Sequence, residues 1–307
     1  LKAVDRAKAF GAEGVVGLGG GSPMDTAKLV AYLLRNDDPL DAIYGVGLAA
    51  GDRAPLILAP TTAGTGSEVT PISIVTTGTS EKKGVVSPVL LPDWALLDPN
   101  LTLGLPPAVT AATGVDAMVH AIEAFTSKHR KNPISDCLAI RALALLNGAI
   151  RTAIRDGSNL QARADMLIGS CLAGMAFANA PVAAVHALAY PVGARFHVPH
   201  GLSNALVLAP ILRRNMAAAA DLYAELAPIF APDLAPGDNQ AAGERMIQAL
   251  EALVADCPMP QRLREVGIAE GDLDVLAEDA MKQTRLLVNN PVAFTQEMAR
   301  AVYAEAL

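Results

Sequence analysis

The hydrophobic positions change their spacing partway along the chain, and this change predicts two kinds of structure. Before about residue 100, short apolar runs bounded by Gly, Asp and Pro turns alternate with amphipathic stretches, as strands of a buried parallel sheet alternate with helices. After residue 106, apolar residues recur at i, i+3, i+4 and i+7, the spacing of packed helices. The chain is therefore predicted to begin as α/β and to continue as all-helical.

The individual segments follow from the same pattern. Strands are predicted over 15–18, 55–59 and 72–75, and helices over 2–10, 108–127, 133–155, 160–178 and 241–255. The two patterns meet at 98–107, where Pro and Gly residues interrupt both periodicities. We place the domain boundary there, with an α/β domain over 1–105 and a helical domain over 106–307.

Composition narrows the class of protein. Of 307 residues, 52% are hydrophobic and 18% charged, and the net charge is −7 without any basic run, which argues against nucleic-acid binding. Because charged residues, prolines or polar residues interrupt every long apolar stretch, we expect no membrane span. The three cysteines, Cys137, Cys171 and Cys257, are odd in number and widely spaced, which favours a reducing, cytoplasmic compartment.

A glycine-rich turn follows the first predicted strand. Gly19-Gly20-Gly21-Ser22-Pro23 leads into a helix for which Ser22 is a candidate N-cap and Pro23 a candidate first residue. Such a helix start offers free N–H groups to a phosphate, although the spacing is neither of the usual nucleotide-binding fingerprints, so an anion site and a plain tight turn both stay open. A second loop of this kind, 60–68, also follows a strand, and two such loops at strand ends favour nucleotide binding.

Four of the five histidines lie in two short regions. Asp116 and His120 are four residues apart in an otherwise apolar helix and project from one face, although an isolated pair of this kind is more often a local hydrogen bond. His186 and His200 flank a segment with Pro and Gly that we read as a turn. Together they would form an oxygen–nitrogen ligand set for Fe(II), Zn or Mn. His197, on an extended segment, and His129, in a charged stretch, are weaker candidates for ligation.

Four motifs occur in order: a GGGS-x-x-D turn, a TT-x-x-TGSE loop, a G-x-D-A-x-x-H-A-I-E helix and a segment that opens at His186 and ends in P-H-G. In this combination the chain resembles the iron-containing (group III) alcohol dehydrogenases. The resemblance implies a dehydroquinate synthase-like architecture, in which a Rossmann-like nucleotide-binding domain, here truncated at its N-terminus, precedes an all-helical metal-binding domain.

The resemblance also implies an activity: transfer of a hydride between NAD or NADP and a small alcohol, aldehyde or ketone, assisted by one divalent metal, Fe(II) in the first place and Zn in the second. It further implies a homo-oligomer, expected to be a dimer. The implied site residues are Gly20, Gly21, Ser22 and Asp25 at the cofactor diphosphate, Thr61, Thr62 and Lys82 at other parts of the cofactor, and the metal ligands Asp116, His120, His186 and His200.

The sequence departs from the family pattern in two respects. Tyr190 replaces the histidine that follows the third ligand by four residues, so it is expected either to relay a proton or to shape the substrate pocket. The early strands that read the adenosine ribose are missing, which leaves NAD and NADP unresolved. A hydroxyacid-oxoacid transhydrogenase of the same family is an alternative, because its carboxylate substrate needs a cation and Arg195 is close to the predicted metal segment. An inactive metal-binding module is a further alternative. The apolar residues Met118, Val119, Phe125 and Leu188 would line a pocket for a small aliphatic substrate or belong to the core.

Overall fold

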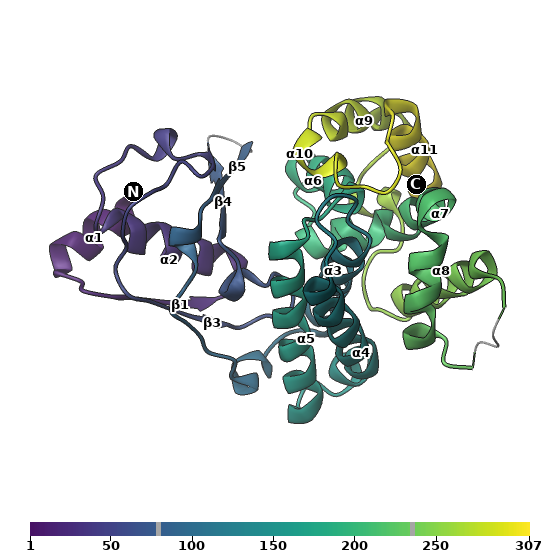
Figure 1. The fold of residues 1–307 in the computed structure, drawn as a ribbon, viewed down its shortest axis with the longest axis horizontal. Coiled ribbons are helices and arrows are strands. Elements are labelled where there is room, and N and C mark those ends of the chain that lie inside the picture. Colours follow the sequence, from purple (N-terminus) through teal and green to yellow (C-terminus); the bar gives the residue numbers. More distant parts are fainter. Residues whose placement is uncertain (78–80, 234–236) are drawn as a thin grey trace.

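The computed structural model describes residues 1–77, 81–233 and 237–307. Two lobes lie side by side: strands and two helices form the N-terminal lobe, and helices form the C-terminal lobe (Figure 1). Every described strand precedes residue 96, and the first long helix after the strands begins at Pro107. The protein is therefore α/β, with a sheet-containing N-terminal part and a helical C-terminal part, and the boundary at residue 105 stays a prediction.

The N-terminal lobe contains two small sheets. Its elements are α1 (Lys2–Phe10), β1 (Val15–Gly19), α2 (Gly21–Leu33), β2 (Gly45–Val46), β3 (Leu56–Pro60), β4 (Ile72–Thr77), β5 (Glu81–Val86) and β6 (Trp94–Ala95). The first sheet has the order β1-β3-β6 and is parallel throughout, while in the second, β2-β5-β4, strand β5 pairs parallel with β2 and antiparallel with β4. Because β1 and β3 are parallel neighbours, the loops that follow them leave the same edge of the sheet.

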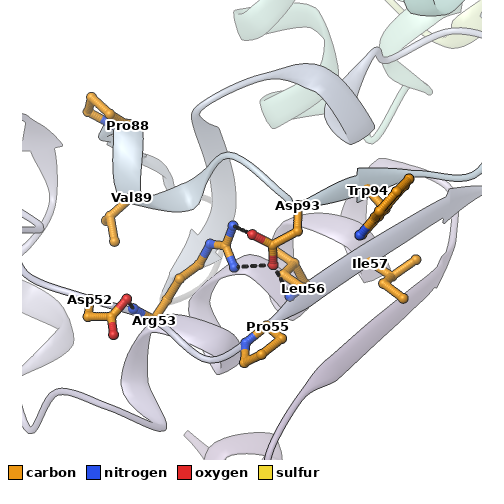
Figure 2. A pocket seen from close by; sticks show the side chains of 9 residues that line it. All are labelled: Asp52, Arg53, Pro55, Leu56, Ile57, Pro88, Val89, Asp93 and Trp94. Atoms are coloured by element: carbon orange, nitrogen blue, oxygen red, sulfur yellow. Dashed lines mark hydrogen bonds and ion pairs between the residues drawn. The ribbon is translucent and has the colours of Figure 1, made fainter.

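The two faces of the β1-β3-β6 sheet differ in burial. Helix α2 covers one face, where Met24, Leu56 and Leu58 are completely buried. On the opposite face, the side chains of Val16 in β1 and Trp94 in β6 are 68% and 71% exposed. A surface cavity of about 520 Å³ lies near this uncovered region (Figure 2), and it is lined by Asp52, Arg53, Pro55, Leu56, Ile57, Pro88, Val89, Asp93 and Trp94. Since none of the predicted site residues lines it, this cavity is not the candidate active site.

The C-terminal lobe is a helical assembly with one continuous core. Its helices are α3 (Pro107–Phe125), α4 (Pro133–Arg155), α5 (Leu160–Asn179), α6 (Ala184–Phe196), α7 (His200–Phe230), α8 (Asn239–Ala255), α9 (Leu273–Met281), α10 (Thr284–Leu287) and α11 (Gln296–Ala306). Asparagine caps start two of them: the Asn132 side chain accepts from the Ser135 N–H and that of Asn159 from the Ala162 N–H. Helix α3 is buried along most of its length and packs against α4, α5 and α7.

Two sequence interpretations are wrong in detail. The segment read as a turn is mostly helix α6, which continues through the buried Pro191 because packing in the core offsets the lost backbone hydrogen bond. The turn itself is shorter and comes at His197, whose left-handed φ of 56° ends the helix. Likewise, α2 begins at Gly21 with Gly20 as its N-cap, so Ser22 lies inside the first turn and caps nothing.

By length and composition, helix α4 is apolar enough to cross a membrane, and the bent pair α5–α6 passes the same test as a unit, among the described residues. In the fold, α4 packs against α3 and α5, and its buried positions, among them Leu143, Leu146 and Ile150, belong to the core of the helical lobe. The polar and charged residues at Arg141, Asn147 and Arg151 interrupt its apolar surface. A core helix satisfies these criteria as well, so the expectation of no membrane span stays a prediction.

Candidate active site

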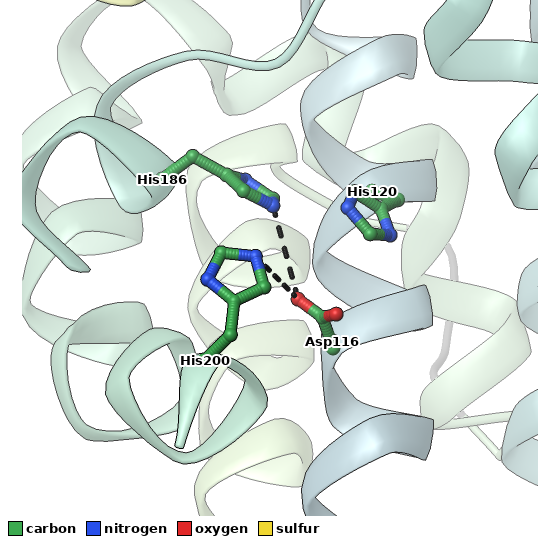
Figure 3. Close-up of side chains that lie close together, drawn as sticks. All are labelled: Asp116, His120, His186 and His200. Atoms are coloured by element: carbon green, nitrogen blue, oxygen red, sulfur yellow. Dashed lines mark ion pairs between the residues drawn. The ribbon is translucent and has the colours of Figure 1, made fainter. Parts of the chain in front are cut away.

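Four side chains from three helices converge in the helical lobe (Figure 3). Asp116 and His120 project from α3, His186 from α6 and His200 from the first turn of α7. One potential ligand atom from each lies within 4.8 Å of all the others. The Oδ1 atom of Asp116 is 3.8 Å from Nε2 of His186 and 3.6 Å from Nε2 of His200. The structure thus brings together the four residues that were singled out as metal ligands.

Hydrogen bonds to the outer ring nitrogens orient two of the histidines. Nδ1 of His120 lies 3.1 Å from the Gly64 carbonyl, and because a carbonyl only accepts, Nδ1 carries a proton and the neutral form of the ring has its lone pair on Nε2. Nδ1 of His186 is 2.7 Å from Oε2 of Glu123, and with Glu123 ionised this arrangement likewise leaves the lone pair on Nε2. In their neutral forms both rings therefore present Nε2 to the cluster, as metal ligation requires.

Glu123 is a site residue that the sequence interpretation missed. Its side chain is buried in α3 and accepts hydrogen bonds from the Ala183 and Val185 N–H groups as well as from His186. Burial raises the pKa of Glu123 to about 7, against the lowering effect of these hydrogen bonds. Asp116, His120 and Glu123 occupy positions i, i+4 and i+7 of one apolar helix, and this periodicity was a usable signal.

The electrostatics suit a bound cation. Burial raises the pKa of Asp116, but the charges of the three neighbouring histidines, His200 foremost, outweigh it, so the pKa lies below its ordinary value. Burial lowers the pKa of His186 well below its ordinary value and also lowers that of His200. One carboxylate and three imidazoles, of which all but His200 are buried, are a fitting donor set for a divalent metal ion.

Tyr190 and Lys82 lie beside the cluster. The ring of Tyr190 is 5.8 Å from that of His200, and Nζ of Lys82, which comes from β5, is 5.9 Å from the centre of the tyrosine ring. Burial raises the pKa of Tyr190, so its phenol keeps its proton near neutral pH. Desolvation lowers the pKa of Lys82, and the negative charge of Asp116 opposes this effect. The two lobes therefore both contribute polar groups to the same site.

The two predicted cofactor loops adjoin each other. They follow the paired strands β1 and β3, and the Thr61 N–H donates to the Gly19 carbonyl at 2.9 Å. A Cβ atom on Gly20 would lie 3.4 Å from Oγ1 of Thr62, and one on Gly21 would lie 3.1 Å from the Thr65 methyl group. Since α2 begins here without a side-chain cap, its first N–H groups are available to an anion.

Asp25 is engaged with the protein itself. Its Oδ1 accepts from the Ser67 hydroxyl at 2.5 Å and its Oδ2 from the Ile74 N–H at 2.9 Å, and Nζ of Lys28 lies 3.7 Å away. Desolvation raises the pKa of Asp25. The carboxylate thereby joins α2 to β4 and to the second cofactor loop, which comprises residues 60–68. The contact of Asp25 with a diphosphate stays a prediction.

Other sequence candidates lie outside the cluster. His129 and His197 are exposed, while Met118, Val119, Phe125 and Leu188 are fully buried members of the helical core. The guanidinium of Arg195 forms an ion pair with Asp279 at 2.5 Å, across α6 and α9. This pairing weakens the case for Arg195 as the group that receives a substrate carboxylate.

Comparison with known proteins agrees with this geometry. Residues 1–99 match the family described as iron-containing alcohol dehydrogenase, and residues 110–307 match the C-terminal part of the Fe-containing alcohol dehydrogenase family. The chain belongs to the iron-containing alcohol dehydrogenase family.

Three relatives illustrate the match. Long-chain-alcohol dehydrogenase 1 of Geobacillus thermodenitrificans is 42% identical over 313 residues, which cover 100% of this chain and 79% of the relative. The crystal structure of a 1,3-propanediol oxidoreductase superposes with a TM-score of 0.96 at 36% identity, covering 100% of this chain and 80% of that one. A sulfoacetaldehyde reductase of Bifidobacterium kashiwanohense, solved with NAD+, superposes with a TM-score of 0.88 at 32% identity, covering 99% and 79%.

Proposed function

We propose that this protein is a metal-dependent alcohol dehydrogenase that transfers a hydride between NAD or NADP and a small alcohol or aldehyde. The observation that carries the proposal is the convergence of Asp116, His120, His186 and His200 within 4.8 Å. These four residues would hold a divalent metal, which would supply a Lewis acid for the alcohol or carbonyl oxygen. Fe(II) is the proposed metal, in line with the family, and Zn is the alternative that the same nitrogen and oxygen ligands accept.

We propose that residues of both glycine-containing loops and of β5 place the cofactor. We assign the diphosphate to the start of α2 at Gly20, Gly21 and Ser22, where uncapped N–H groups and the helix dipole favour a doubly charged anion. Thr61, Thr62 and Lys82 are proposed to contact the rest of the cofactor, because the two threonines adjoin this helix start and Lys82 lies beside Tyr190. NAD is the form to test first, since the related sulfoacetaldehyde reductase was solved with NAD+.

Tyr190 is proposed either to relay a proton through its hydroxyl or to shape the substrate pocket. Because burial raises its pKa, the phenol is a poor general base near neutral pH, whereas its O–H group can donate a hydrogen bond beside His200. The family's usual imidazole could accept a proton directly at this position. The proton released on alcohol oxidation then leaves through water or the cofactor ribose. A homodimer and a cytoplasmic location stay predictions.

The test couples metal content to turnover. Purified protein reconstituted with Fe(II) is expected to hold about one metal ion per chain and to change NADH absorbance with short alcohols or aldehydes. His200→Ala is expected to lose both tight metal binding and turnover, because it removes one of four ligands. The exposed His129 supplies the matched control, and His129→Ala should retain both. Unchanged metal content in His200→Ala would remove the metal assignment.

A further inference from the structure

A fifth polar side chain, Asn204, lies within the four-residue cluster. It is completely buried and is placed one helical turn after His200 on α7, so the two side chains project from the same face. Its Nδ2 donates to Oδ1 of Asp116 at 2.5 Å and lies 3.3 Å and 3.4 Å from Nε2 of His186 and His200. The amide nitrogen is therefore in contact with three of the four potential ligand atoms.

The chemistry of the surroundings determines the orientation of this amide. The contacted atoms are a carboxylate oxygen and two imidazole nitrogens, and the bond from His186 to Glu123 leaves the inner nitrogen of that ring as an acceptor. An amide N–H₂ group suits these acceptors, whereas the reversed amide would set its carbonyl oxygen against the Asp116 carboxylate.

The amide oxygen of Asn204 is in an unfavourable environment in this orientation. Oδ1 of Asn204 is buried and has no hydrogen-bond partner among the described residues. Leaving a buried acceptor unpaired is unfavourable, so the amide is held here by its bonds on the cluster side. If both the N–H₂ group and the carbonyl oxygen of the amide had hydrogen-bond partners, stabilisation of the fold alone would explain its position.

We propose that Asn204 is a positioning residue of the metal centre, which acts by holding the Asp116 carboxylate in place through its N–H group. The proposal rests on the proposed metal site. A neutral donor suits this role, because it fixes the orientation of the carboxylate without adding charge to the ligand set. An aspartate at 204 would bring a second negative charge next to Asp116, and an apolar residue would leave the carboxylate oxygen without its donor.

The first test measures metal affinity directly, without turnover. Co²⁺ is titrated into the metal-free full chain in competition with a chromogenic chelator, and the visible Co²⁺ spectrum reports the coordination geometry. Asn204→Ala is expected to weaken Co²⁺ binding about 10- to 100-fold and to alter the spectrum. Asn204→Leu preserves more of the volume and gives the same readout if the alanine variant fails to fold.

The same helix supplies the matched control. Asn215 is also a buried amide on α7, but it exchanges hydrogen bonds with Asn290, away from the cluster. Asn215→Ala is therefore expected to lower thermal stability while it leaves Co²⁺ affinity unchanged. An equal loss of affinity in Asn215→Ala and Asn204→Ala would show a general effect on the helix and overturn the proposal.

A double-mutant cycle separates positioning from direct ligation. If Asn204 acts through Asp116, Asn204→Ala should change Co²⁺ affinity by less than about twofold once Asp116→Ala is present. The same 10- to 100-fold loss in both backgrounds would mean that Asn204 is itself a ligand, which overturns the positioning role. Wild-type affinity in Asn204→Ala also overturns it and leaves the proposed function intact. A wild-type chain that binds no Co²⁺ or Fe(II) instead refutes the metal centre as a whole.

Discussion

At the scale of single residues, the second cofactor loop is joined to α2 by charged groups buried away from water. Lys28 is completely buried and donates to the Ile72 carbonyl at 2.6 Å and to the Thr70 hydroxyl at 3.2 Å. Glu68 is 1% exposed, and its Oε1 has no partner among the described residues. Burial raises the pKa of Glu68 to about 7 and lowers that of Lys28 to about 8, although each charge favours the other. Ionisation here is therefore unfavourable in the folded state.

Glu68→Gln tests this interpretation through the pH dependence of stability. The folded pKa of about 7 exceeds the ordinary value of 4.5, so Glu68 contributes stability that is present below pH 4.5 and lost as the pH rises through 7. Relative to wild type, the glutamine variant should gain about 2 to 3 kcal/mol of unfolding free energy between pH 4.5 and 7.5.

The measurement is urea unfolding of both proteins at matched pH values, since the titration of the shared histidines cancels in the difference. A difference that stays constant over the whole range would contradict the raised pKa of Glu68.

At the scale of elements, two glycines set how closely the second cofactor loop approaches α5. A Cβ on Gly174 would lie 2.8 Å from Cα of Gly66, and one on Gly66, whose φ is +60°, would lie 2.5 Å from Cα of Gly174. The same loop carries Gly64, whose carbonyl orients His120. Backbone contact between the loop and the helix therefore places both the hydroxyls that are proposed to contact the cofactor and one candidate metal ligand.

Gly174→Ala is expected to push this loop away from α5. The forced displacement should lower the unfolding free energy by about 1 to 3 kcal/mol and weaken NAD binding, measured by urea unfolding and by titration calorimetry. Gly148→Ala is the control, because a Cβ at that position of α4 meets nothing within 4 Å. The control should be neutral or stabilising by up to about 1 kcal/mol. Equal effects of the two substitutions would mean that the close approach is unimportant.

At the scale of the whole molecule, the candidate metal centre joins elements that are far apart in the sequence. Its side chains come from α3, α6 and α7, and the hydrogen bond from His120 to Gly64 extends the connection to the N-terminal lobe. A ligand that binds only the folded chain stabilises it in proportion to the logarithm of its concentration. The metal is therefore expected to stabilise the contact between the lobes as well as the helices.

Metal removal should lower the melting temperature. At a metal concentration of about 100 times Kd, binding adds about 2.7 kcal/mol, which corresponds to a shift of about 4 °C for a chain of this length. Differential scanning calorimetry with and without Fe(II), after chelation, measures the shift. His200→Ala should melt at one temperature in both conditions, and a metal-dependent shift in that variant as large as in wild type would locate the ion elsewhere.

The sequence by itself determined the division into an α/β part and a helical part, because hydrophobic spacing directly reflects which side chains a strand or helix buries. It also determined the four candidate metal ligands, since motif order and the i, i+4 spacing of Asp116 and His120 are local properties. The family membership inferred from these motifs is confirmed by the comparisons.

Only the tertiary structure decided the rest, because burial and hydrogen-bond partners depend on segments far apart in the chain. Helix α6 persists through Pro191 because it is packed in the core. Glu123 and Asn204 become part of the site only when α6 and α7 fold against α3, 60 to 88 residues away in the sequence. Spacing in the sequence predicts which side chains share a face of one helix. It does not predict which polar side chains from three different helices come into contact.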